Sequence, residues 1–183
     1  ENADAKLSIA RAAIPYLVPN TSIFLDAGTT VMSLVRQLPN QHYTIVTSGA
    51  NIAIELSQRS KSTVSCVGGQ ISSSTLSLSG PQAEAFLATV NIDTAVLAAT
   101  GYSAGAGFTV GSYTENSLKR RVIQKADKVI LLIDRSKLGR TLPFTFASLS
   151  DIDVVICDAP LPEDFIQAAR AAGTEVLQVQ PAK

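Results

Sequence analysis

A shortage of histidine and cysteine limits the chemistry that this chain can carry. Its 183 residues include one histidine, His42, and two cysteines, Cys66 and Cys157. With one histidine, the chain has too few histidines for a histidine-rich metal site, and a serine–histidine–aspartate triad could use only His42. Each cysteine lies within an apolar run, which predicts a buried, reduced thiol. His42 precedes a strand-like segment and is predicted to lie at the surface beside a turn. We expect neither a bound metal nor a cofactor.

Net charge and long apolar runs are missing as well. Fifteen Lys and Arg residues balance fifteen Asp and Glu residues, so no overall field attracts nucleic acid and these residues are not expected to contact DNA. No apolar run reaches the roughly 18 residues of a membrane helix, and the amino end lacks a signal peptide. These absences predict a soluble, cytoplasmic protein. The length predicts a single domain over residues 1–183, and the start at Glu1 suggests that an upstream segment is missing.

The chain does contain a regular alternation of strand-like and helix-like segments. Apolar runs bounded by turn residues predict strands at 22–25, 43–47, 63–67, 71–79, 93–98, 129–133, 142–149, 153–157 and 175–179. Helical spacing predicts helices at 4–17, 29–38, 50–56, 81–88, 115–128 and 163–172. The wholly apolar strand 129–133 is expected inside the sheet, and residues 101–111 are expected to form a glycine-rich loop. The alternation predicts a three-layer, Rossmann-like α/β fold with a mainly parallel sheet.

One stretch, Ile23–Thr30, is typical of an anion site. Three apolar residues end in Asp26-Ala-Gly-Thr-Thr, which predicts a buried strand, a tight turn and a helix start. The helix N-terminus leaves backbone N–H groups unpaired, Gly28 permits close approach, and the hydroxyls of Thr29 and Thr30 add donors. The other interpretation is that Asp26 or Thr29 caps the helix and Gly28 only turns the chain.

The other predicted strands also end in small, polar or cationic residues. In parallel α/β sheets the ligand crevice lies beyond the carboxyl ends of the strands. Five such ends on one rim would line a pocket for a small hydroxylated anion: 26–30, 47–49, 68–69, 100–102 and 134–137.

Taken in order, several motifs resemble the effector domain of DeoR-type transcriptional regulators. They are Asp26-x-Gly-Thr-Thr, Thr47-Ser48, Gly68-Gly69, Glu115-x-x-x-Lys119-Arg120, Asp134-Arg-Ser-Lys-Leu-Gly and Ile152-Asp-x-x-Ile-x-Asp158. The resemblance extends from about Lys6 to Val179. It implies a sensor of a phosphorylated sugar or sugar acid, similar in fold to ribose-5-phosphate isomerase and glucosamine-6-phosphate deaminase. It also implies a repressor of carbohydrate metabolism genes that acts as a homodimer or homotetramer. Operator DNA would be bound by an amino-terminal winged helix-turn-helix that this chain lacks.

The resemblance assigns residues to two parts of a ligand site, with no catalytic residue. The phosphate would be bound by Asp26, Gly28, Thr29, Thr30 and Lys119. The sugar would be bordered by Thr47, Ser48, Gly69, Thr100, Gly101, Tyr102, Glu115 and Lys137.

Thr100 departs from the family pattern, which usually has an acid at this position. Related isomerases use carboxylates here, because enediol chemistry needs a base within hydrogen-bond reach. No acid occurs between Thr94 and Tyr113. This weakens the alternative of an isomerase or deaminase on the same fold, which fold analogy alone leaves open.

Several residues keep two interpretations. Lys119 either contacts the ligand or faces water from a basic helix. Tyr102 and Phe108 either cover the pocket as a lid or belong to an ordinary core. Asp134 is predicted to hold the turn after its strand, and the role of Lys137 stays open.

Overall fold

A seven-stranded parallel sheet forms the centre of the chain in the computed structural model, which describes residues 2–59 and 61–181. Its strand order is β12-β11-β9-β6-β1-β2-β3, and every neighbouring pair is parallel. The strands are β1 (Ser22–Leu25), β2 (Thr44–Thr47), β3 (Thr63–Cys66), β6 (Ile92–Ala98), β9 (Ala126–Leu132), β11 (Val154–Asp158) and β12 (Glu175–Val179). The predicted parallel sheet is confirmed, with β9 in its interior.

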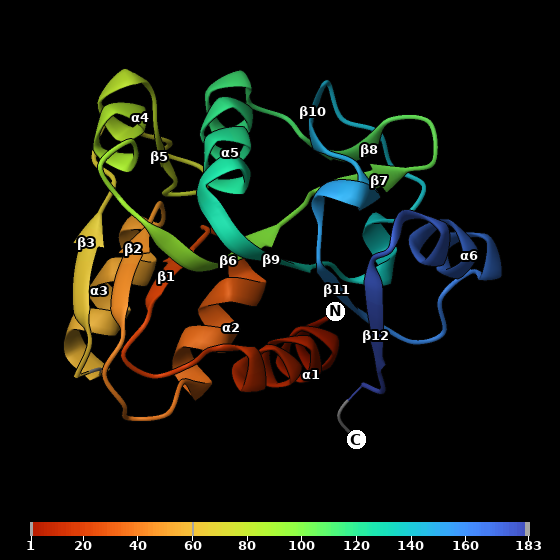
Figure 1. Cartoon of the computed structure of the whole chain (residues 1–183), viewed down its shortest axis with the longest axis horizontal. Helices are drawn as coiled ribbons and strands as arrows, with labels where there is room; N and C mark the ends of the chain where they lie inside the picture. Colours follow the sequence, from red (N-terminus) through yellow and green to blue (C-terminus); the bar gives the residue numbers. More distant parts are fainter. Residues whose placement is uncertain (1, 60, 182–183) are drawn as a thin grey trace.

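Helices cover both faces of this sheet and make three layers. Figure 1 shows α4 (Pro81–Leu87) and α5 (Tyr113–Lys125) on one side, and α1 (Ala3–Ala13) and α2 (Thr29–Gln37) on the other. The remaining helices are α3 (Ala50–Arg59) and α6 (Glu163–Ala172), with short 3₁₀ turns η1 (Ile14–Tyr16), η2 (Arg135–Lys137) and η3 (Leu149–Asp151).

Side-chain alternation along the strands divides the core between the two faces. On β1, Ile23 and Leu25 belong to the core cluster that includes buried residues of α1, α2 and α3, whereas Phe24 belongs to the cluster that includes buried residues of α4, α5 and α6. This follows from the two-residue period of a strand, which sends successive side chains to opposite faces. Burial on both faces explains the apolar runs 23–25 in β1 and 154–157 in β11.

Two small antiparallel sheets correct the sequence-based expectations. The predicted glycine-rich loop at 101–111 is a hairpin of β7 (Gly101–Ser103) and β8 (Gly107–Val110), extended by β10 (Phe144–Ala147). The predicted strand 71–79 is instead β4 (Gln70–Ile71) and β5 (Leu78–Ser79), joined by a turn. In that turn Leu76 donates its N–H to the Ser72 carbonyl and takes φ +58°, so local backbone bonding prevails over the alternating pattern.

Other boundaries differ for local reasons. The first helix ends at Ala13, before Pro15 in the 3₁₀ turn, rather than at Leu17. Helix α5 ends at Lys125, and β9 starts three residues earlier than predicted because Ala126 and Lys128 pair with β6.

The two cysteines lie in different environments. Cys157 is buried in β11 as predicted, but Cys66 is exposed. The prediction for Cys66 was wrong because β3 is an edge strand of the large sheet. His42 is exposed, as predicted. Within the described residues, no helix is long and apolar enough to cross a membrane.

Candidate functional site

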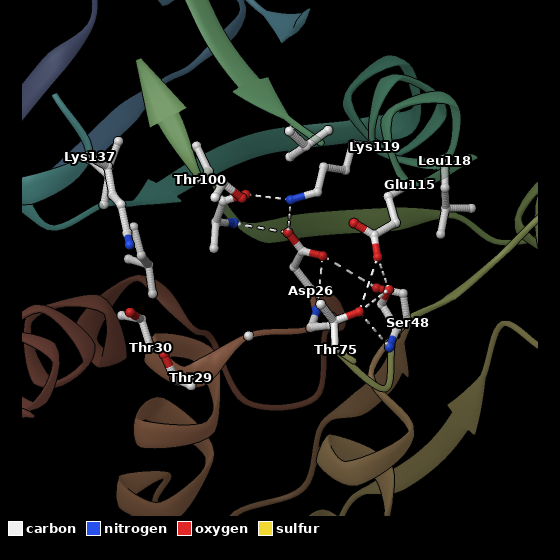
Figure 2. Close-up of a pocket in the computed structure, with 18 of the residues that line it drawn as sticks. Asp26, Thr29, Thr30, Ser48, Thr75, Thr100, Glu115, Leu118, Lys119 and Lys137 are labelled. Carbon is white, nitrogen blue, oxygen red and sulfur yellow. Dashed lines mark hydrogen bonds and ion pairs between the residues drawn. The ribbon is translucent and has the colours of Figure 1, made fainter. Parts of the chain in front are cut away.

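A cavity of about 220 Å³ lies beyond the carboxyl ends of β1, β6 and β9. Its walls are apolar at Phe24, Leu118 and Leu132. Its polar lining comes from both faces of the sheet: Lys6, Asp26, Gly28, Thr29, Thr30, Ser48, Thr75, Ser77, Thr100, Glu115, Lys119, Asp134 and Lys137. In Figure 2, Thr29, Thr30 and Lys137 lie on one side, and Ser48, Thr75 and Glu115 on the other.

The N-terminus of α2 opens into this cavity without a side-chain cap. Gly28 is the N-cap residue at φ +128°, and within residues 2–59 and 61–181 the helix start has no side-chain cap. The first intrahelical bond that closes the turn runs from the Met32 N–H to the Gly28 carbonyl. The first-turn amides and the positive end of the helix dipole therefore face the cavity without a side-chain acceptor. The interpretation that Asp26 or Thr29 caps this helix does not hold.

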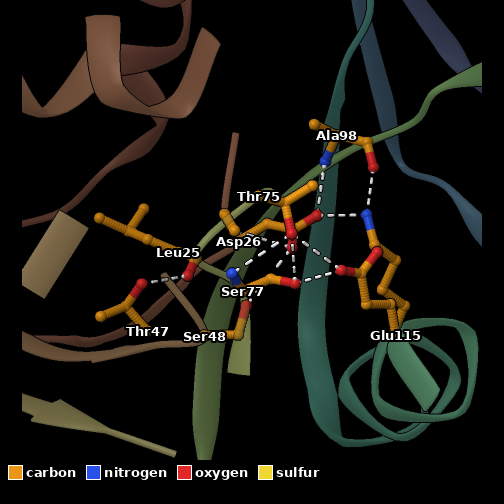
Figure 3. A network of polar contacts seen from close by, with 10 residues as sticks. Leu25, Asp26, Thr47, Ser48, Thr75, Ser77, Ala98 and Glu115 are labelled. Carbon is orange, nitrogen blue, oxygen red and sulfur yellow. Dashed lines mark hydrogen bonds and ion pairs between the residues drawn. The ribbon is translucent and has the colours of Figure 1, made fainter. Parts of the chain in front are cut away.

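Asp26 is instead the centre of a buried hydrogen-bond network (Figure 3). Its carboxylate accepts bonds from the backbone N–H groups of Ala27 at 2.9 Å and Ala98 at 3.0 Å, and from the Ser48 hydroxyl at 3.4 Å. The Lys119 ammonium lies 2.5 Å from it. With so many donors at one carboxylate, Asp26 organises the floor of the cavity and leaves little acceptor capacity for a ligand.

Lys119 is buried with its charge already compensated. It pairs with Asp26, donates to the Ala98 carbonyl and lies 4.8 Å from the ring centroid of Phe146. The solvated-surface interpretation of Lys119 does not hold. Two other cations line the cavity, Lys6 from α1 and Lys137 from η2, and neither forms an ion pair within the described parts of the chain. Sequence reasoning missed Lys6, because nothing in the pattern of α1 shows that its start lies at this rim.

Glu115 forms a second acidic point, at the N-terminus of α5. The Ser112 hydroxyl accepts a bond from the Glu115 N–H at 3.4 Å, which caps the helix. The Glu115 carboxylate accepts bonds from the Thr75 hydroxyl at 3.2 Å and from the Ser77 hydroxyl. Thr75 and Ser77 were also missed, because the serine-rich run carries no signal for a contact with a helix some forty residues away.

The structure brings nine of the thirteen predicted site residues to the cavity. They are Asp26, Gly28, Thr29, Thr30, Ser48, Thr100, Glu115, Lys119 and Lys137. Asp134 also lines it, and holds the turn after β9 by accepting bonds from the backbone N–H and the hydroxyl of Ser136.

The other four predicted residues lie outside the cavity lining. Thr47 is buried and donates its hydroxyl to the Leu25 carbonyl at 2.7 Å. Gly69 and Gly101 lie close to other parts of the backbone. A Cβ added at Gly69 or Gly101 would lie 2.4 Å or 2.6 Å, respectively, from a backbone carbonyl oxygen. Tyr102 packs against Phe108 and Phe165 with ring centroids 4.8 Å and 5.0 Å away.

The core interpretation of Tyr102 and Phe108 therefore holds, and they form no lid. Burial, with the nearby Asp164 carboxylate, raises the pKa of Tyr102 above its ordinary value, because both disfavour the phenolate.

Comparison with known proteins agrees with this architecture. The chain is similar in fold to ribose-5-phosphate isomerase A from Methanocaldococcus jannaschii, with a TM-score of 0.57 and 18% identity over 78% of this chain and 57% of that one. It is 35% identical to the HTH-type transcriptional regulator GlpR of Haloferax volcanii, covering 97% of this chain and 69% of that protein. It is 30% identical to the HTH-type transcriptional repressor GlcR of Bacillus subtilis, covering 95% and 67%.

The relatives in sequence are named as regulators or repressors of transcription, and the prediction of a regulator rather than an enzyme is confirmed. The family described as the DeoR C terminal sensor domain matches residues 1–159. The chain therefore belongs to the DeoR family of transcriptional regulators, as a C-terminal sensor domain.

Proposed function

We propose that this sensor domain binds a phosphorylated sugar or sugar acid in the cavity at the carboxyl ends of β1, β6 and β9. One observation carries the proposal. The uncapped N-terminus of α2 lines the same small cavity as Lys6 and Lys137, which form no ion pair in the described residues, and as the Glu115 carboxylate, which accepts bonds from hydroxyls. A ligand with an anion at one end and hydroxyls along its length fits that distribution of charge.

The phosphate would bind at Gly28, Thr29 and Thr30. Backbone N–H groups of the first turn and the two hydroxyls would donate to its oxygens, as at other helix N-termini that bind anions. Lys6 and Lys137 would supply the opposing charge. Lys119 would act mainly by holding Asp26, because its ammonium is already paired.

The sugar hydroxyls would bind on the side of Glu115. Ser48 and Thr75 lie on this side and Thr100 lines the same cavity, and all three hydroxyls can both donate and accept hydrogen bonds. The Glu115 carboxylate is an acceptor only when ionised, so it would receive hydroxyl hydrogens from the ligand.

Binding would control transcription through a separate DNA-reading domain. The relatives are named HTH-type, and this chain spans 69% and 67% of their lengths. We propose that residues 1–183 form a single sensing domain that follows a winged helix-turn-helix. The full protein would act as a homodimer or homotetramer, because operator symmetry mirrors protein symmetry. The ligand would shift operator binding through its different affinity for two arrangements of the subunits.

A thermal-shift screen tests the ligand class. The panel contains ribose 5-phosphate, glucose 6-phosphate, glucosamine 6-phosphate and 6-phosphogluconate, each beside its unphosphorylated parent. A ligand at 100 times its Kd stabilises the folded state by about 2.7 kcal/mol, which raises the Tm by about 5 °C or more in a chain of this size. Thr30→Val and Lys137→Gln should reduce that shift, whereas Arg140→Gln, an exposed site three residues beyond Lys137, should not. No shift with any phosphate, or equal shifts with the unphosphorylated parents, would overturn the proposal.

A further inference from the structure

The first turn of α1 lies at the rim of the cavity. Lys6 lines the cavity from the first turn of α1, and the positions that follow on the same face of the helix, Ile9, Ala10 and Ala13, are buried in the core. The body of the helix is therefore fixed by packing, and its start is the part that a ligand can reach. Any segment that precedes α1 in the protein attaches beside this rim.

Asn2 ties that start to the loop after β9. It occupies the N-cap position of α1, where an Asn side chain usually caps its own helix, yet no such bond forms. Its side-chain amide donates instead to an Asp134 carboxylate oxygen at 3.2 Å and to the Ser136 hydroxyl at 3.3 Å. The same loop carries Lys137 into the cavity. The amino end of α1 and η2 are thus already linked across the chain.

Two cations of this rim come from the two linked elements. Lys6 and Lys137 line one cavity, and neither has an acidic partner within the described residues. Like charges without a counter-ion disfavour close approach, and an anion between them removes that cost. An anion at the N-terminus of α2 would therefore hold α1, α2 and η2 together. The anion would then interact more favourably with the arrangement in which these elements are close than with one in which they are apart, and a ligand-driven change requires such a difference.

We propose that the first turn of α1 reports whether the cavity is occupied. A phosphate at α2 binds Lys6 and Lys137 together, and so fixes the start of α1 relative to η2. The position and order of the preceding segment then depend on the ligand, which gives the sensor a direct route to whatever domain lies upstream. This inference rests on the proposed phosphate site and adds the element that transmits its occupancy.

Hydrogen exchange of this chain, titrated with inorganic phosphate against chloride at equal ionic strength, tests the proposal. Phosphate should slow exchange of the backbone amides in the first two turns of α1 by about tenfold, while amides of α6 on the opposite face stay unchanged. Lys6→Gln should weaken phosphate binding about tenfold, as expected for a charge-assisted bond, and should abolish the slowing. Arg11→Gln removes a cation from the same helix but outside the cavity and should change neither result.

A second variant keeps the test independent of the ligand. Asn2→Ala removes the link to Asp134 and Ser136 and should speed exchange of the same amides in the phosphate-free chain. Phosphate that stabilises the protein without slowing exchange at α1, or slowing that survives Lys6→Gln, would overturn this inference alone. Absence of any stabilisation by phosphate would overturn the proposed site, and this inference with it.

Discussion

Lys119 and Asp26 meet at a single residue of β6, Ala98. Their charged atoms lie 2.5 Å apart, and both residues are buried, with Asp26 4% exposed and Lys119 8% exposed. The Asp26 carboxylate accepts the Ala98 N–H, and the Lys119 ammonium donates to the Ala98 carbonyl. This closed set joins the end of β1 to α5 and forms the floor of the cavity, so the pair is part of the scaffold that shapes the site.

Breaking this pair on one side should destabilise the fold strongly. Lys119→Met leaves a buried carboxylate without its cation, and Asp26→Asn leaves a buried ammonium without its anion. Each should lower the free energy of unfolding by about 3–5 kcal/mol, measured by urea denaturation. The double variant should lose much less than the sum of the two, because no uncompensated charge remains. Additive losses would contradict a coupled pair.

Much of this fold could be predicted from sequence because it depends on local signals. Strand β1 at Ser22–Leu25 and strand β12 at Glu175–Val179 have the predicted bounds, since turn residues flank both apolar runs. Helix α6 at Glu163–Ala172 also has its predicted bounds, and ends at Gly173 with φ +77°, the left-handed cap that glycine favours.

The unpredicted parts depend on partners distant in sequence. Lys6 reaches the cavity only because α1 packs against α2, and Ser77 meets Glu115 across 38 positions. The residue types at the strand ends indicated an anion site, but not that Lys119 would be paired with Asp26. Cys66 shows the same limit, because only the strand order places β3 at an edge.

The two cysteines should differ sharply in reactivity. Cys66 is exposed on β3, whereas Cys157 is buried beside the carboxylates of Asp158 and Asp134. Burial first, and then these negative charges, raise the pKa of the Cys157 thiol well above its usual range, and only the thiolate reacts. Iodoacetamide at pH 8 should therefore modify Cys66 alone in the folded chain and both cysteines in urea, as read by peptide mass spectrometry. Equal labelling in the folded chain would contradict this burial.

Two glycines of the β7–β8 hairpin should respond differently to the same substitution. Gly107 has φ +77°, and a Cβ there would lie 2.5 Å from the Ala147 carbonyl oxygen. Gly105 is at the exposed tip, where a Cβ would have no heavy atom within 4 Å apart from Gly105 itself and its two neighbours in the chain. Gly107→Ala should lower the free energy of unfolding by about 2 kcal/mol or more, and Gly105→Ala should change it by less than about 0.5 kcal/mol. Thermal unfolding compares them, and equal effects would contradict the hairpin geometry.

Glu115→Gln should separate recognition of the sugar from recognition of the phosphate. The amide can still accept bonds from Thr75 and Ser77, but it loses the charge that strengthens bonds from ligand hydroxyls. We expect binding of the best sugar phosphate to weaken about tenfold, equivalent to about 1.4 kcal/mol, with inorganic phosphate unaffected.

Glu84→Gln is the matched control for that measurement. Glu84 is also half-buried and accepts a bond from a serine, Ser117, but it lies on α4 outside the cavity lining. Isothermal calorimetry should show no change in either affinity for this variant. If Glu115→Gln weakened both ligands equally, Glu115 would act by holding the 72–77 turn and the shape of the whole cavity. The proposed contact between Glu115 and the sugar hydroxyls would then be contradicted, because loss of such a contact cannot weaken binding of a ligand that has no sugar.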